Sequence, residues 1–213
     1  MSRQVLTLAD VERLGGYEII YADPNWLYRQ KGRGAAENHY RTSPASVIAS
    51  LPVSRIAAKN AVLFLWATWP IFIDSDDVKT VMRAWGFTPK TLGFLWVKTN
   101  SKAGTPFWGG GSWTRANSEF CLIAVRGDTR RINAGVHQLV ETWDTGDNVL
   151  HAPFTGHSAK PPEVRERIVQ LMGDLPRIEL FARDRVAGWD AWGKEVPGGS
   201  DVIGLDVEQA LAV

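Results

Sequence analysis

The residues with the clearest chemical potential are Asp23, Pro24, Asn25 and Trp26, which directly follow an apolar run ending at Ala22. In an open α/β sheet, ligands bind at the carboxyl ends of strands, so these residues would lie at a binding edge. A carboxylate at position 23 can accept a hydrogen bond from an amine, while an indole at position 26 stacks on the ring that carries it. An Asp-Pro pair alone more often starts a turn, so the tetrapeptide leaves both interpretations open.

The exocyclic amine of adenine is a group that such an arrangement could serve. It is a poor nucleophile because its lone pair is delocalised into the ring. A carboxylate and a backbone carbonyl that accept its N–H bonds favour the reactive, more tetrahedral nitrogen and stabilise the positive charge that develops during attack. Help of this kind is commonly worth a factor of about 10² to 10⁴ in rate. The base must also leave its stack, and an aromatic face offsets that cost by roughly 1–3 kcal/mol.

The elements that must position these residues can be read from hydrophobic periodicity. Short apolar runs alternate with segments of helical period, which is typical of a mostly parallel α/β sheet with helices on both faces. The expected strands are residues 17–22, 62–67, 92–97, 120–126 and 178–182. The expected helices follow Ser43-Pro44, run from Asp74–Asp77 to Gly86, and follow Pro161-Pro162 as far as Gly173. We therefore expect one domain over residues 1–196 and a C-terminal tail over residues 197–213.

Composition limits the class of protein. The chain has 213 residues, of which 45% are hydrophobic, so it can bury one large core. Its net charge of +1 creates no general attraction to phosphate, and nucleic-acid contact would need a local basic patch. The apolar surroundings of Cys121 indicate a buried strand, not a reactive thiol. No window approaches 18 uninterrupted apolar residues and no apolar signal core begins the chain, so we expect a protein of the cytoplasm without membrane contact.

Taken together, these segments resemble the adenine N6-methyltransferases of the MT-A family, named after the seventy-kilodalton catalytic subunit of the eukaryotic mRNA adenosine methyltransferase. That family also has many bacterial and phage members that act on DNA. The resemblance runs from about Tyr17 to Glu195, and its segments occur in the family's order. They are Ala22 to Trp26, His39-Tyr40, Leu63 to Trp66, Trp96 to Asn100, Glu119 to Leu122, His157 to Pro161, Ile178 to Arg183 and Trp189 to Gly193.

The resemblance implies a Rossmann-like methyltransferase sheet, with the catalytic strand early and the cofactor-binding elements late in the chain. It also implies S-adenosylmethionine as the methyl donor and no metal. By this resemblance Asp23 binds the target amine near the cofactor's amino group, Pro24 supplies a carbonyl and Trp26 a stacking face. Lys160 corresponds to a lysine that holds the cofactor carboxylate, and Arg183 to an arginine near its ribose. The remaining residues assigned to the cofactor are Phe181, for which a purely structural role is equally open, Lys194 and Glu195.

The resemblance places a gate over the target base in the segment from Arg29 to Tyr40. The basic, glycine-containing composition of this segment fits such a role independently, because phosphates need positive charge that can close over them. Solvated surface is the ordinary explanation of such a cluster. The residues expected to bind substrate are Arg29, Lys31, Arg33, Tyr40, Trp66 and Lys98, with simple packing an equal alternative for Trp66.

Two positions depart from the family pattern. Asn25 stands where the family has a second proline, so the turn lacks a rigid φ constraint. Lys194 stands where the family usually has Asn, and an ammonium cannot accept a hydrogen bond. These departures leave open a catalytically weak or inactive subunit that acts as a scaffold. An N4-cytosine methyltransferase is a second alternative, because its catalytic turns look similar.

The substrate and setting follow from context. A compact, prokaryote-like chain without a zinc finger or long N-terminal extension favours DNA over RNA. We therefore expect a DNA methyltransferase in the cytoplasm of a prokaryotic or phage-infected cell, acting as a homodimer, with a second subunit or alone.

Overall fold

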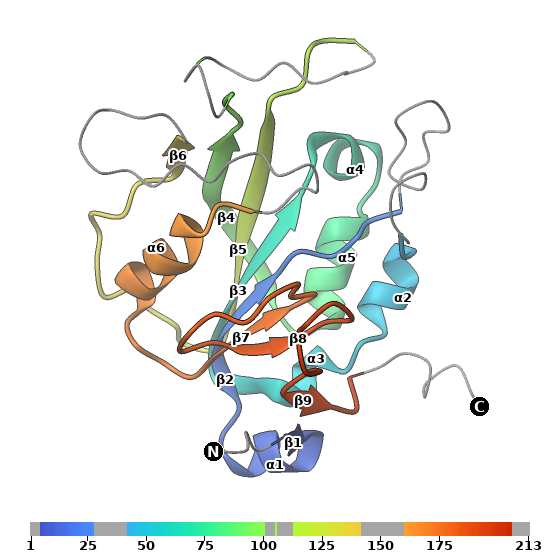
Figure 1. Cartoon of the computed structure of the whole chain (residues 1–213), viewed down its shortest axis with the longest axis vertical. Helices are drawn as coiled ribbons and strands as arrows, with labels where there is room; N and C mark the ends of the chain where they lie inside the picture. The colour runs from blue at the N-terminus through green and yellow to red at the C-terminus, as the bar shows by residue number, and fades with distance from the viewer. Residues whose placement is uncertain (1–4, 28–41, 101–104, 106–112, 142–159, 206–213) are drawn as a thin grey trace.

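The computed structural model describes residues 5–27, 42–100, 105, 113–141 and 160–205 (Figure 1). A seven-stranded sheet with the order β6-β4-β5-β3-β2-β7-β8 forms its centre. The strands are β2 (Tyr17–Ala22), β3 (Ala57–Ala67), β4 (Thr88–Val97), β5 (Ser118–Arg126), β6 (Leu139–Glu141), β7 (Arg177–Leu180) and β8 (Asp190–Trp192). β5 runs antiparallel to its neighbours β3 and β4, and the other pairs in the sheet are parallel. The predicted α/β class with a mostly parallel sheet is confirmed.

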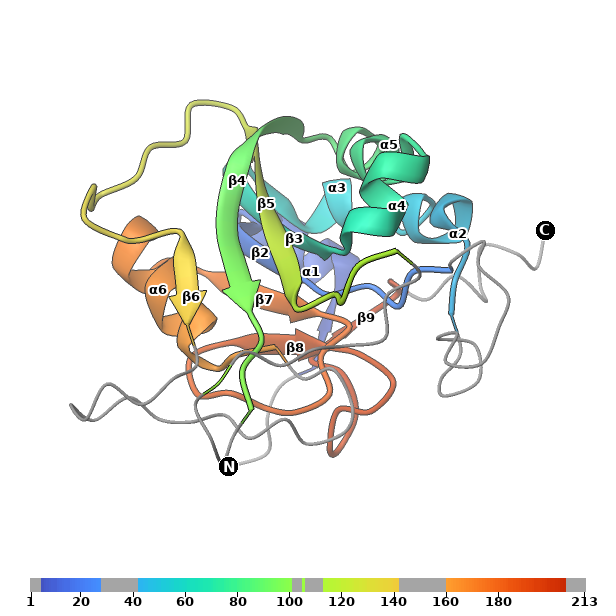
Figure 2. The same ribbon diagram turned by 90° about the horizontal axis from the view of Figure 1, so that it is seen from above.

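Helices cover both faces of this sheet (Figures 1 and 2). One face carries α2 (Ala45–Ala49), α3 (Val53–Ile56), α4 (Trp69–Asp74) and α5 (Asp77–Ala84), and the other carries α6 (Glu163–Met172). Successive strand side chains point to opposite faces, so Ile20 packs in the core under α2–α5 and Ile19 packs with Ile168 of α6. This two-sided burial explains why the strands read as continuous apolar runs. Among the described helices, none is long and apolar enough to cross a membrane.

Several element boundaries differ from the sequence-based expectation, and β3, β4 and β5 begin before the expected residues 62, 92 and 120. The closing strand ends at Leu180 instead of residue 182, because Phe181 has a φ of 61° that turns the chain out of the sheet. The expected N-cap at Ser43 is wrong: Pro44 occupies that position without a side-chain hydrogen bond, and the backbone of Ser43 pairs with the turn after β2. The helix expected from Asp74–Asp77 to Gly86 is α5, which begins at Asp77. The helix α4 before it was not predicted, and the extended Ser75 separates the two.

The chain ends form a second, smaller sheet. β1 (Leu6–Thr7) precedes α1 (Leu8–Arg13) and pairs in parallel with β9 (Val202–Ile203). Part of the stretch expected as a C-terminal tail is therefore packed against the domain, and Val202 and Leu205 are buried. The polar, glycine-rich start of this stretch predicted a tail, but its two apolar residues complete the core beside α1.

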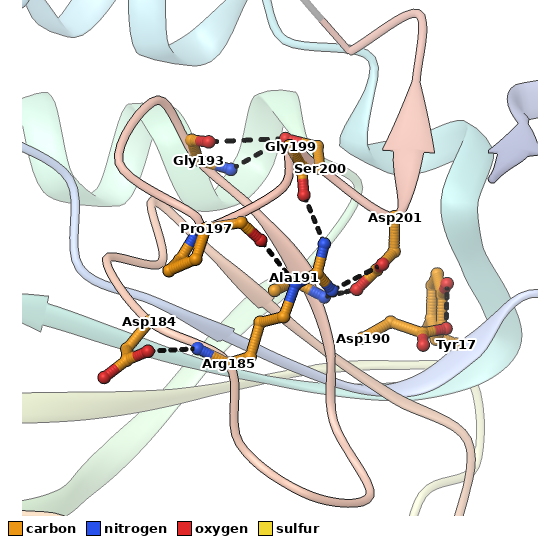
Figure 3. Close-up of polar contacts among 10 residues, drawn as sticks. All are labelled: Tyr17, Asp184, Arg185, Asp190, Ala191, Gly193, Pro197, Gly199, Ser200 and Asp201. Atoms are coloured by element: carbon orange, nitrogen blue, oxygen red, sulfur yellow. Dashed lines mark hydrogen bonds and ion pairs between the residues drawn. The ribbon is translucent and has the colours of Figure 1, made fainter. Parts of the chain in front are cut away.

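A buried carboxylate fixes this terminal stretch (Figure 3). Asp201, whose side chain is 4% exposed, accepts hydrogen bonds from Nη1 of Arg185 at 2.7 Å and from the backbone N–H of Ala191 at 2.8 Å. Arg185 also donates to the carbonyl oxygens of Pro197 and Gly199. One arginine thus closes the loop between β8 and β9 onto the end of the main sheet.

Replacement of Asp201 by Ala is expected to lower the free energy of unfolding by about 2–4 kcal/mol, because a guanidinium and a buried N–H lose their acceptor. Urea denaturation measures the loss. Asp128→Ala is the matched control: its ion pair with Arg130 is exposed on both sides, so a change within about 0.5 kcal/mol is expected. Equal losses in the two variants would contradict this account of Asp201.

Candidate active site

Five elements bring their ends to one edge of the sheet. Ala22 of β2 pairs with Leu65 of β3 and with Leu180 of β7, so the residues that follow these parallel strands lie side by side. β5 begins at this edge because it runs in the opposite direction, and α6 begins there as well. The result is a pocket lined by Asp23, Pro24, Asn25, Trp26, Trp66, Ala67, Thr68, Glu119, Lys160 and Arg183.

Alternating charges occupy the floor of this pocket. The Nζ atom of Lys160 lies 2.8 Å from Oδ2 of Asp23 and 3.2 Å from Oε2 of Glu119. The other oxygen of Glu119 accepts from Nζ of Lys98 at 2.5 Å. The side chains of Lys160 and Glu119 are only 7% and 10% exposed. Such desolvated charges are tolerated because each carboxylate has an ammonium partner.

The cluster gives its two carboxyl groups different acidities. Burial raises the pKa of Asp23 above its usual value, and the Lys160 ammonium opposes this only in part. For Glu119, burial acts in the same direction, but Lys160 and Lys98 together outweigh it and lower its pKa. The pKa of Lys160 is raised, because the two carboxylates outweigh its burial. Lys160 and Glu119 are therefore charged at neutral pH, and Asp23 is the carboxyl group that takes up a proton more readily.

The turn that carries Asp23 is held by backbone hydrogen bonds. The carbonyl of Asn25 accepts from the N–H of Ser43 at 2.8 Å, and the N–H of Leu27 donates to the Ser43 carbonyl at 3.1 Å. Within the turn, the N–H of Trp26 donates to the Pro24 carbonyl at 2.9 Å. These contacts fix the conformation that a second proline would otherwise restrict at position 25.

Two indoles form one wall of the pocket. Nε1 of Trp26 donates to the Trp66 carbonyl at 2.9 Å, and Nε1 of Trp66 donates to the Tyr21 hydroxyl at 2.7 Å. Both side chains are almost fully buried, at 3% and 1% exposed. The two Nε1–H hydrogen bonds fix the orientation of both indoles. Glu179, an acid on β7, is not among the lining residues and forms a two-point ion pair with Arg165.

The structure brings most of the predicted site together. The pocket contains Asp23, Pro24, Asn25, Trp26, Trp66, Lys160 and Arg183. Lys98 is not among the lining residues and joins the cluster through Glu119. Phe181 packs edge-on against Trp192, with ring centroids 5.4 Å apart.

The remaining predicted residues lie apart from the pocket or cannot be placed. Lys194 and Glu195 follow β8 and do not line it. Gly193 before them lies against the backbone of Ala182, where a Cβ atom would approach the carbonyl oxygen to 2.1 Å. The predicted substrate residues Arg29, Lys31, Arg33 and Tyr40 lie outside the described residues.

Glu119 is the functional candidate that sequence reasoning missed. It appears within a segment used for the resemblance, but no role was attached to it. The available signal was an acid immediately before the apolar run that starts at Phe120, since an ionisable residue at the end of a buried strand needs a partner.

Removal of the central ammonium is expected to destabilise the fold in a pH-dependent way. Lys160→Met should lower the free energy of unfolding by about 3–5 kcal/mol at pH 7, because Asp23 loses its counter-ion and Glu119 loses one of two. The pKa of each carboxyl then rises in the folded state, so the folded protein binds protons more tightly than the unfolded chain. Lowering the pH through these pKa values therefore reduces the loss.

Denaturation of wild type and variant at pH 7 and pH 5 measures both effects. The control is Lys79→Met, whose partner Asp76 is 80% exposed, and a change within about 0.5 kcal/mol at either pH is expected. A loss in Lys160→Met that grows on acidification would show that the carboxylates do not depend on this ammonium.

Comparison with known proteins agrees with this geometry. The MT-A70 family profile matches residues 17–195. The Type II methyltransferase M.MunI of Mycoplasma sp is 31% identical over 202 residues, which covers 85% of this chain and 78% of that protein. The N(6)-adenosine-methyltransferase subunit METTL3 of Danio rerio is 27% identical over 192 residues, 89% of this chain and 30% of the relative. The MT-A70-like N(6)-adenosine-methyltransferase of Arabidopsis thaliana is 26% identical over 188 residues, 87% of this chain and 24% of the relative.

The chain thus spans a third or less of the two eukaryotic relatives and most of the bacterial one. The family profile covers every element that contributes to the pocket, from β2 to the turn after β8. The chain belongs to the MT-A70 family of adenine N6-methyltransferases.

Proposed function

We propose that this protein transfers the methyl group of S-adenosylmethionine to N6 of adenine in DNA. The observation that carries the proposal is the convergence of Asp23, Lys160 and Arg183 in one pocket, beside the indoles of Trp26 and Trp66. These residues come from separate parts of the chain, and each matches a role that the family resemblance assigns. A site reduced to a scaffold would have no need to keep them together.

The charges of the pocket fit the proposed cofactor. S-adenosylmethionine, when bound, supplies an electrophilic methyl group on a sulfonium. Lys160 would bind its carboxylate, and Asp23 would accept a hydrogen bond from its amino group. Arg183 lines the same pocket and would lie near its ribose. Glu119 adds a negative charge to the same floor. Anionic side chains near a sulfonium also favour its binding through simple attraction.

The acceptor adenine would use Asp23 and the turn that follows it. Asp23 accepts one N–H bond of the amine, and the Pro24 carbonyl accepts the other with the lone pair that Trp26 N–H leaves available. Methyl transfer from the cofactor would leave a surplus proton on the nitrogen, and Asp23 would accept this proton. A carboxyl whose pKa is raised by burial is suited to take this proton.

The choice of DNA rests on the relatives. The match to the bacterial Type II methyltransferase extends over most of both proteins, at 31% identity. The N(6)-adenosine-methyltransferases match at lower identity, and only with a minor part of their length. These relatives also make RNA the alternative that a direct experiment must separate.

Loss of the Asp23 carboxylate is expected to remove transfer and preserve the fold. Asp23→Asn should lower the single-turnover rate by about 10² to 10⁴-fold, because an amide neither accepts the proton nor balances the developing charge. Rapid-quench assays with labelled methyl donor measure the rate, and circular dichroism checks the fold. Asp128→Asn, an exposed acid far along the chain, should retain full activity. Turnover at the wild-type rate in Asp23→Asn would remove Asp23 from this role.

The product of the reaction tests the substrate. Wild-type protein should place label on DNA oligonucleotides and not on RNA of the same sequence, and hydrolysis should release N6-methyladenine. Label in RNA alone would overturn the choice of DNA, and N4-methylcytosine would overturn the choice of base. Folded protein that shows no heat with millimolar cofactor in calorimetry would instead support the scaffold alternative.

A further inference from the structure

An exposed tryptophan adjoins the pocket without belonging to it. Trp69 begins α4 immediately after Ala67 and Thr68, two residues that line the pocket. α4 lies beside the end of β3 at the same edge of the sheet (Figure 2). The Trp69 side chain is 41% exposed, whereas Trp66, three residues earlier, is buried. A half-exposed aromatic ring at the rim of a polar pocket is placed to contact a planar ligand.

The ring is held in one orientation. Its Nε1 atom donates to the hydroxyl of Ser118 at 3.2 Å. Its centroid lies 4.5 Å from that of Phe120, a buried residue of β5, and Phe72 of α4 contacts the same phenyl ring at 5.3 Å. Ser118 and Phe120 flank Glu119 of the pocket. The indole is therefore fixed against β5, the strand that carries Glu119, and no ordering is required before it binds a planar group.

The geometry points to a specific occupant: we propose that Trp69 stacks on a base that neighbours the target adenine. This inference rests on the proposed function. A base that leaves its stack also exposes the face of its neighbour. A rigid indole at the rim of the receiving pocket replaces the lost contact, and stacking of this kind tolerates any base because every base has a π face.

The surroundings favour a single base over a protein partner. The exposed large apolar side chains on α4 are Trp69 and Ile73. Two side chains offer far less surface than the roughly 800 Å² that each side of a stable protein interface buries. Acidic residues follow at the other end of the helix, namely Asp74, Asp76 and Asp77. Their charge repels a phosphate backbone along α4, so the platform serves a nucleotide at the pocket end only.

Binding of oligonucleotides tests the inference separately from methyl transfer. Trp69→Leu keeps apolar bulk against Phe120 but has no π face, and Trp69→Phe keeps an aromatic ring. In fluorescence anisotropy with a duplex whose target adenine is unpaired, Trp69→Leu should bind about 5- to 100-fold more weakly than wild type. Trp69→Phe should lose less than about threefold. Ile73→Ser, a control on the same helix, should bind as wild type does, and calorimetric affinity for the cofactor should not change in any variant.

A double-mutant cycle locates the stacked base. Abasic sites are placed one at a time on each side of the target. At one position the abasic site should weaken wild-type binding as much as Trp69→Leu does. In the Trp69→Leu variant, the same abasic site should cause no further loss of affinity. Photo-crosslinking of wild-type protein to 5-iodouracil at that position should label Trp69, a measurement that does not depend on the folding of any variant.

Unchanged affinity in Trp69→Leu, or additive losses at every position together with no crosslink to Trp69, would overturn the inference. Self-association lost in Trp69→Leu with unaltered oligonucleotide binding would also overturn it, by showing a protein interface. If the double-mutant cycle shows coupling between Trp69 and one base but the protein does not methylate adenine, the stacking role of Trp69 is retained and the proposed function is wrong.

Discussion

One buried ammonium sets the character of the whole site. Asp23 and Glu119 would repel each other at the edge of the sheet, and burial alone would drive both to take up protons. Lys160 lies between them, within 3.2 Å of each carboxylate. The three side chains come from the end of β2, the start of β5 and the residues before α6. The Lys160 ammonium therefore connects three separate elements and stabilises the charged form of both carboxyl groups.

The direction of β5 makes this contact achievable. In a fully parallel sheet the residue before a strand lies at the edge opposite to the binding edge. β5 is antiparallel to both neighbours, so its first residues, Ser118 and Glu119, lie on the side where β2, β3 and β7 end. The same reversal supplies the hydroxyl that orients Trp69. One inverted strand thus contributes both to the charged floor of the pocket and to its aromatic rim.

The sequence predicted the position of a residue correctly where that residue directly follows or precedes a clearly recognisable strand or helix. Asp23 follows a clear apolar run and Lys160 precedes a clear helix, and both lie in the pocket as their positions suggested. Glu119 escaped notice because an apolar run does not reveal the direction of its strand. The end of β7 was predicted two residues too late because an apolar run does not reveal the left-handed φ of Phe181. β9 was missed because only two residues pair there. Local patterns identify elements, whereas register and direction arise from long-range packing.

The turn after β2 shows how tertiary contacts can replace a covalent restriction. Without a second proline, the φ angle at Asn25 is free in the unfolded chain, and the Ser43 backbone must hold the turn in the folded one. Ser43 immediately precedes α2, whose Ile48 carbonyl accepts the buried Trp85 indole N–H at the end of α5. The geometry around Asp23 therefore depends on the packing of α2 against α5. The Ser43 backbone thus couples the turn that carries Asp23 to the helical layer of α2 and α5.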